Sequence, residues 1–422
     1  MKKTTTLRSS YDNTFFYGLA TSAVNALSTG PLVTAYALAL GAGTVTLGCL
    51  QAVWPIANLV HLPVSYFIEK GKSLKKIAVF SSLISRPFWL IAALAAFWKG
   101  SDLSLTLFTI SYFLAFIIGS IAGGAFLPWI KELVYPRLMN GFFAHRIKYI
   151  LLTRILFVSM ATGIIWVIQR YYPDYEIYTY SFFFAIAFLM GLYATWTLYR
   201  ISDKPIVPVK GKSFFQKIVF TFRNKSFVAL LFSLSSINFS MNFITPFTVV
   251  FMLTYLKLSV GMTMLFTILW QLTDSFTITH WSKRTKTTNV NKTLIEASYF
   301  YICGGILFLL TLFSTNYPIV IFSLLILAHF IIGIGSAGLN LGINDVAVSY
   351  VPQKMSSVYI SINNTFRFLF AALAPITAGI FLNTLKNISS IYAWGSFFIV
   401  SSILFTGVIF LISKMTYIRE EN

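Results

Sequence analysis

The sequence predicts an all-α polytopic membrane protein with twelve transmembrane helices, in two six-helix bundles joined by a cytoplasmic linker. Three observations lead to this class. Hydrophobic residues make up 57% of the chain and charged residues only 10%. An ordinary soluble domain contains fewer hydrophobic and more charged residues. Apolar runs of about 20 residues, enough to cross hydrocarbon as a helix, recur along its whole length. Most of its Lys and Arg residues fall between those runs.

The twelve apolar runs fall into two sets of six, separated by one long polar stretch. That stretch, 200–225, holds seven of the 32 Lys and Arg residues and two prolines. We therefore predict a bundle at 1–199, a cytoplasmic linker at 200–225 that could contain an amphipathic helix, and a second bundle at 226–422. The expected spans are 13–39, 44–68, 77–98, 103–127, 149–169, 178–199, 226–254, 259–281, 293–314, 318–342, 356–384 and 389–413.

The positive charges predict the orientation. When the loops alternate between sides, 25 Lys and Arg residues lie on the side of the termini, four on the other side and three within spans. Loops rich in Lys and Arg stay in the cytoplasm. We expect a multi-pass protein of the inner (plasma) membrane with both termini cytoplasmic.

Landmarks repeat between the two halves at a nearly constant offset, 215 residues for the first pair and 216 for the others. Such a repeat predicts two six-helix halves in the same orientation, related by an axis along the membrane normal. The matched pairs are Pro31 and Pro246, Trp54 and Trp270, Lys76 and Lys292, and Pro136 and Pro352.

Two loop sequences carry a family resemblance. Between the second and third spans, Glu69, Lys70, Gly71 and Lys72 are similar to the acid, base, glycine and following cations of the motif typical of the major facilitator superfamily. The motif's first glycine and second arginine are absent. The stretch 129–146 resembles a pattern found between helices 4 and 5 of some bacterial members, with one extra residue before the proline and Asn where Arg is usual.

The resemblance implies which helices do what. In that superfamily helices 1, 4, 7 and 10 line a central cavity, helices 2, 5, 8 and 11 flank and gate it, and helices 3, 6, 9 and 12 support it. It also implies that Glu69, Lys70, Gly71 and Lys72 form a gate on the inner side. A charged turn that only fixes the topology is the alternative.

Five charged residues lie within predicted spans, where a charge is costly and marks a functional site by default. On cavity-side helices we expect Arg154 and Arg367 to bind an anionic substrate, because a planar guanidinium suits carboxylate or phosphate. Asp274 is the deep carboxylate on such a helix and the candidate proton site. The alternative role for Asp274 is a static buried ion pair with an arginine, or a latch between the two halves. On support helices, Arg86 and Glu296 are interpreted as structural charges.

Polar residues within spans indicate a water-accessible centre. Asn25, Asn242 and Asn364 are the candidates for neutral hydrogen-bonding groups to the substrate. Small polar residues also hold membrane helices together, which is the alternative for each of them.

These features favour a secondary active transporter that moves a small, anionic organic solute by alternating access. We expect transport to be coupled to an ion, with H⁺ as the first candidate. An efflux permease for amphiphiles, drugs or siderophores is the alternative within the fold. A non-transporting membrane sensor or scaffold is the alternative of another class. No catalytic constellation or phosphate-binding loop occurs, so we expect no enzyme, cofactor or metal. We expect a monomer in the lipid bilayer, with no nucleic-acid partner.

Overall fold

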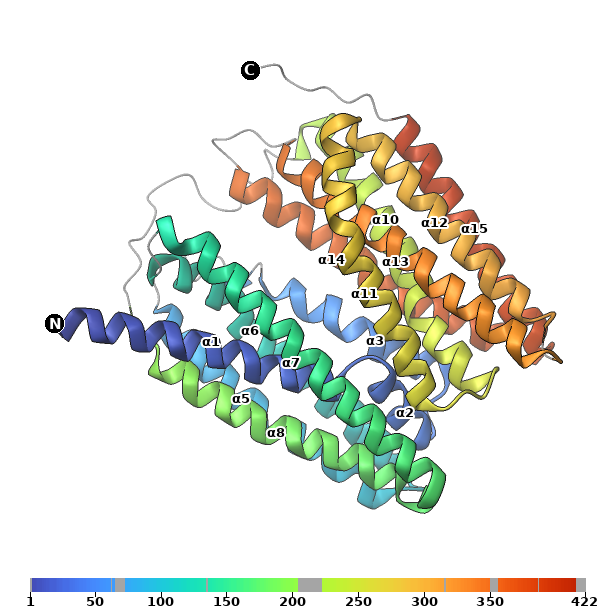
Figure 1. The fold of residues 1–422 in the computed structure, drawn as a ribbon, viewed down its shortest axis with the longest axis horizontal. Coiled ribbons are helices and arrows are strands. Elements are labelled where there is room, and N and C mark those ends of the chain that lie inside the picture. The colour runs from blue at the N-terminus through green and yellow to red at the C-terminus, as the bar shows by residue number, and fades with distance from the viewer. Residues whose placement is uncertain are drawn as a thin grey trace. The chain divides into compact units, whose positions relative to one another are not determined.

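The structure, a computed structural model, describes two units built of helices (Figure 1). Unit 1 comprises Met1–Gly43, Val53–Gly211 and Ser259–Gly261, and unit 2 comprises Thr44–Ala52, Lys212–Leu258 and Met262–Asn422. The described residues are 2–61, 63–64, 73–133, 136–203, 222–314, 316–349, 356–385 and 387–414.

The described part of unit 1 contains five long helices and three short ones. They are α1 (Lys2–Ser28), α2 (Pro31–Ala39), α5 (Leu74–Leu94), η1 (Ala95–Trp98), α6 (Asp102–Leu133), α7 (Pro136–Tyr171), η2 (Pro173–Tyr175) and α8 (Glu176–Arg200). The helix α3 (Thr44–Leu59) begins in unit 2 and ends in unit 1.

The described part of unit 2 contains six further helices besides the start of α3. They are α10 (Lys225–Thr254), α11 (Val260–Thr287), α12 (Val290–Thr311), α13 (Pro318–Ser349), α14 (Ser356–Leu385) and α15 (Ser390–Ser413).

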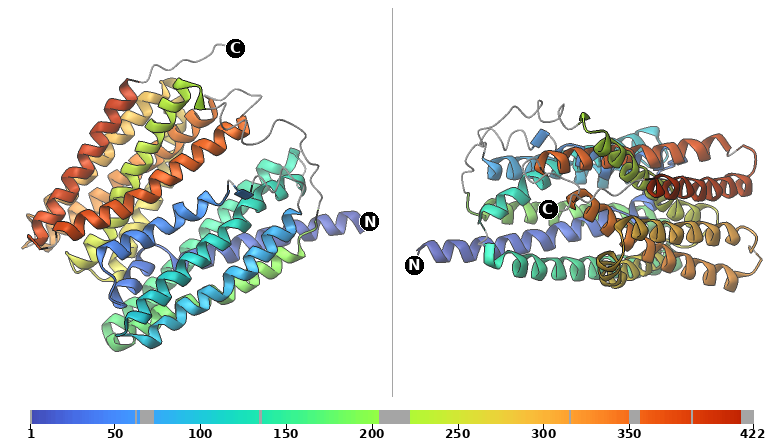
Figure 2. Two further views of the ribbon diagram at one scale, coloured as in Figure 1. Left: turned by 180° about the vertical axis from the view of Figure 1, so that it is seen from behind. Right: turned by 90° about the horizontal axis from the view of Figure 1, so that it is seen from above.

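The same set of helix contacts occurs inside each unit. In unit 1, α5 packs on α6 and α8, and α1 packs on α7 and α8; in unit 2, α12 packs on α13 and α15, and α10 packs on α14 and α15. The views of Figure 2 show these helices running alongside one another within each unit. The starts of α5 and α12, and those of α6 and α13, are both 216 residues apart. The spacing of the sequence landmarks thus recurs in the spacing of the helices.

Within the described residues, nine helices are long and apolar enough to cross a membrane. They lie at Leu74–Trp98, Asp102–Ile130, His145–Tyr171, Pro173–Arg200, Lys225–Thr254, Val290–Thr311, Pro318–Val346, Ser361–Leu385 and Ser390–Ser413. The predicted spans at 13–39, 44–68 and 259–281 are not among them. The first is divided between two helices, the second has only 16 residues in α3, and the third, α11, is continuous but rich in polar residues.

The predicted first span is broken rather than bent. Gly30 has φ of 66°, a left-handed conformation that favours glycine. Pro31 then begins α2 as its first residue, where its missing N–H costs no hydrogen bond. In contrast, Pro246 lies inside the continuous helix α10. The two matched prolines therefore have different local structures.

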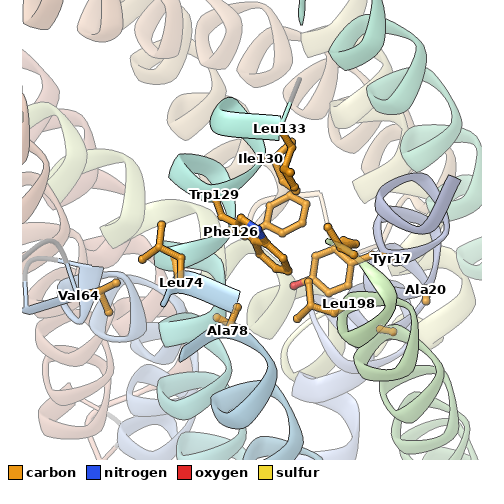
Figure 3. Packing of buried hydrophobic residues seen from close by; sticks show 14 residues of the cluster. Tyr17, Ala20, Val64, Leu74, Ala78, Phe126, Trp129, Ile130, Leu133 and Leu198 are labelled. Atoms are coloured by element: carbon orange, nitrogen blue, oxygen red, sulfur yellow. The ribbon is translucent and has the colours of Figure 1, made fainter. Parts of the chain in front are cut away.

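Aromatic and aliphatic side chains fill the interior of unit 1. Tyr17 from α1 and Phe126 from α6 lie with their ring centroids 4.8 Å apart, and Trp129 and Leu198 are fully buried beside them (Figure 3). The Trp129 indole donates a hydrogen bond to the Ser202 carbonyl at 3.1 Å. This core joins α6 and α8 to α1, so burial of large rings stabilises the bundle.

Candidate functional site

Arg367 lies on α14, and its guanidinium is only partly hydrogen-bonded within the described residues. Its side chain is half-buried, and its buried Nε has no hydrogen-bond partner among the described residues. Its Nη1 is 3.4 Å from the Asn344 Oδ1, a long hydrogen bond. Asn344 lies beyond the predicted span 318–342, so it was not among the predicted site residues. The helix α13 continues to Ser349 and brings this amide to the arginine.

A second amide accompanies Arg367 on its own helix. Asn363 is 2% exposed, and neither its amide nitrogen nor its oxygen has a partner in the described part of the chain. It precedes Arg367 by four residues, so both lie on one face of α14. The predicted Asn364 is half-buried and lies three residues before the arginine. Arg367, Asn344 and Asn363 are called the arginine site below.

Asp274 on α11 has hydroxyl groups as neighbours. Its half-buried carboxylate lies beside Ser336 of α13, and its Oδ1 is buried without a hydrogen-bond partner among the described residues. Ser336 also lies beside the hydroxyl of Tyr301 on α12, and so does Thr245 of α10. Four helices of unit 2 thus supply one cluster of oxygens. No arginine is paired with Asp274 in the parts of the chain that the structure describes.

The other predicted substrate residues differ in their surroundings. Arg154 on α7 is half-buried in unit 1, and its Nε has no partner in the described ranges. Asn25 on α1 is exposed. Asn242 donates to the Asn238 carbonyl of its own helix at 2.8 Å, which leaves its side-chain oxygen as the group for a ligand. The convergence of Arg154 and Arg367 on one substrate remains a prediction.

Arg86 lies inside unit 1, bonded to hydroxyl groups. It is 7% exposed, and it donates from Nε to the Thr195 Oγ1 at 3.0 Å and from Nη2 to the Ser82 Oγ at 2.7 Å. The bond to Thr195 connects α5 to α8, whereas the bond to Ser82 lies within α5. The close approach needs Gly191, because a Cβ there would lie 2.7 Å from the Arg86 Cδ.

Gly191→Ala is expected to destabilise unit 1. The added methyl would push Arg86 away from Ser82 and Thr195, and losing hydrogen bonds from a buried charged group costs about 1–3 kcal/mol. The measurement is the thermal unfolding temperature in detergent. Gly163→Ala in α7 is the matched control, because nothing lies within 4 Å of its Cβ position. Equal unfolding temperatures of the two variants would contradict the prediction.

Glu296 forms an ion pair with Arg284. The Arg284 Nη2 donates to Oε1 at 2.6 Å and its Nε donates to Oε2 at 3.1 Å, which joins the end of α11 to the start of α12. Both side chains are more than one third exposed.

Glu296→Gln is therefore expected to lower the unfolding temperature less than Gly191→Ala does. The small loss should vanish in about 1 M salt, because salt screens exposed ion pairs. A large loss that persists at high salt would contradict this.

The predicted inner gate, Glu69, Lys70, Gly71 and Lys72, lies outside the described residues. The same is true of 204–221, the greater part of the predicted linker, where the amphipathic helix was placed.

No family model matches the chain, and no curated relative matches it. Solved structures do match. A mutant of the nucleoside transporter NupG has a TM-score of 0.69 at 16% identity, over 96% of this chain and 100% of its own. A D-xylose–proton symporter has a TM-score of 0.65 at 14% identity, over 94% and 96%. A bacterial homologue of the human lysosomal transporter Spinster, inward-facing and occupied, has a TM-score of 0.65 at 12% identity, over 98% and 97%.

The chain has the major facilitator fold. The similarity extends over nearly the full length of each chain, so it includes both units and not one bundle alone. A major facilitator fold agrees with the resemblance carried by the loop at 69–72. At 12–16% sequence identity, the similarity to solved structures shows the architecture alone. The substrate has to be argued from this chain's own residues.

Proposed function

We propose that this protein is a secondary active transporter that moves a small organic anion across the inner membrane by alternating access, with both termini in the cytoplasm. The fold supports transport, since major facilitator halves rock around a site near the middle of the membrane. The observation that supports an anion is Arg367, whose buried Nε has no partner among the described residues and whose Nη1 contacts the neutral amide of Asn344.

The arginine site suits a carboxylate or phosphate group. A guanidinium presents several donors in a plane, and here Nε remains for a ligand. The amides of Asn344 and Asn363 add donors that do not neutralise its charge. Arg154 is proposed to supply the second guanidinium from the other unit.

Asp274 is proposed to couple transport to H⁺. Its carboxylate is close to hydroxyl groups and is not paired with an arginine among the described residues, so it is free to take up and release a proton. A carboxylate within a membrane protein that changes its charge during the cycle converts an ion gradient into solute movement. A D-xylose–proton symporter among the similar structures is one example of proton coupling in this fold.

Uptake by purified protein in proteoliposomes tests the proposal. A thermal-shift screen of metabolite carboxylates and phosphates would first select ligands, because a ligand that binds only the folded protein raises its unfolding temperature. Radiolabelled hits should then accumulate when a pH gradient is imposed, and Asp274→Asn should abolish accumulation while leaving exchange of the solute. If no anion accumulates under any gradient, or if neutral amphiphiles move instead, the proposal is wrong.

A further inference from the structure

Two buried oxygens in unit 2 have no hydrogen-bond partner among the described residues, and the groups that carry them lie near each other. One is the Asp274 Oδ1 and the other is the Tyr301 hydroxyl. Tyr301 is 1% exposed, so no bulk water satisfies its hydroxyl. A buried unpaired polar group costs free energy, and each such group in a native structure calls for an explanation. A ligand between these oxygens would supply one.

The neighbours of the two oxygens are themselves oxygens. The Ser336 hydroxyl lies beside both the Asp274 carboxylate and the Tyr301 hydroxyl, and Thr245 lies beside the latter. The Asn340 amide donates to the Ser336 Oγ at 3.2 Å, which holds that hydroxyl in place and leaves it a second lone pair. Thr245, Asp274, Tyr301 and Ser336 are called the oxygen cluster below.

The chemistry of the oxygen cluster selects the ligand. Oxygen donors suit hard cations, whereas the later transition metals such as copper and zinc favour nitrogen and sulfur. No group of three or more His, Cys, Asp and Glu side chains that could hold a metal occurs in the described ranges. One carboxylate balances one positive charge, so a monovalent cation leaves the site neutral within the membrane.

The close packing of α12 against α13 favours a small ion. At Gly335, the residue before Ser336, a Cβ would lie 2.9 Å from the Ala297 carbonyl and 3.0 Å from the Tyr301 ring. The two helix backbones therefore approach too closely to leave room for a side chain at Gly335, beside the oxygen cluster. We propose that Asp274, Ser336, Tyr301 and Thr245 form a binding site for a sodium ion.

This inference rests on the proposed role of Asp274 in ion coupling and adds a second cation to it. Sodium and a proton would occupy the same carboxylate in turn, because either one neutralises it. The cluster uses residues from α10, α11, α12 and α13, so bound sodium would tie four helices of unit 2 together.

Thermal unfolding of the full-length protein in detergent tests the site. Sodium chloride, potassium chloride and choline chloride are compared at the same ionic strength. Sodium is expected to raise the unfolding temperature by roughly 2–4 °C over choline, and potassium by less. Ser336→Ala and Tyr301→Phe should each shift the sodium titration to higher concentration, and Asp274→Asn should abolish the rise.

The matched controls are Ser401→Ala and Tyr359→Phe, both of buried residues in unit 2 outside the oxygen cluster, and they should keep the sodium response. Equal unfolding temperatures in sodium and choline would overturn the inference, as would an unchanged response in Ser336→Ala, Tyr301→Phe and Asp274→Asn. Equal stabilisation by potassium would overturn the choice of sodium. If sodium has no effect on the unfolding temperature while a pH gradient drives uptake, this inference fails and the proposed function stands. If sodium raises the unfolding temperature but no anion is taken up, the sodium site stands and the proposed function fails.

Discussion

Gly48→Ala and Gly379→Ala are expected to be among the most destabilising small substitutions in this protein. Within unit 2 the start of α3 crosses α14 so closely that a Cβ at Gly48 would lie 2.3 Å from the Pro375 carbonyl oxygen, and one at Gly379 would lie 2.5 Å from the Thr44 oxygen. The Thr44 hydroxyl also donates to the Gly379 carbonyl at 3.1 Å. Because the obstacles are backbone atoms, no change of rotamer relieves the overlap.

Each of the two substitutions should cost about 1–3 kcal/mol or more, as overpacking does, measured as a lower unfolding temperature in detergent. Gly407→Ala in α15 is the matched control: nothing lies within 4 Å of its Cβ position, and alanine stabilises a helix relative to glycine. The double variant should not show the sum of the single losses, because both residues belong to one crossing. Unfolding temperatures equal to that of Gly407→Ala would show that the helices do not approach this closely.

Arg367→Ala is expected to raise the KM for the transported anion by about 10- to 100-fold, the range for losing a charge-assisted hydrogen bond. Arg367→Lys should fall between Arg367→Ala and the natural protein, because lysine keeps the charge but lacks the planar set of donors. The measurement is the initial rate of uptake into proteoliposomes against substrate concentration.

Arg170→Ala serves as the matched control for Arg367→Ala. Arg170 is an exposed arginine at the end of α7, so its loss should leave KM unchanged. Asn344→Ala should raise KM less than Arg367→Ala does, since it removes a neutral group that contacts the arginine at 3.4 Å. An unchanged KM in Arg367→Ala would remove this arginine from the substrate site and with it the main support for an anion.

Helix positions were largely predictable from hydropathy, since lipid demands continuous apolar helices. The predicted span 226–254 and the helix α10 at Lys225–Thr254 nearly coincide, as do 389–413 and α15 at Ser390–Ser413. The structure differs from the prediction within the first span, which is not one continuous helix. Gly30 and Pro31 end one helix and begin another inside a run that hydropathy shows as continuous.

The candidate site was only partly predictable. Charged residues such as Arg367 and Asp274 stand out in a membrane sequence because each is costly there. Their neighbours do not, because a serine or tyrosine within a span is common. Ser336 and Tyr301 lie 62 and 27 residues from Asp274 in the chain, and Asn344 lies beyond the predicted end of its span. Sequence spacing contains no signal for these contacts, which arise when α11, α12 and α13 pack.

The sequence by itself determined the class of the protein, the positions of most helices and the few charges that the membrane must accommodate, because transfer of each residue into lipid is a local property. Only the tertiary structure decided the partners of those charges. Arg86 is bonded to hydroxyls of Ser82 and Thr195, Arg367 to an amide, and Asp274 lies among hydroxyls and, within the described residues, not beside an arginine. Partners depend on which helix faces meet, and that is set by packing of the whole bundle.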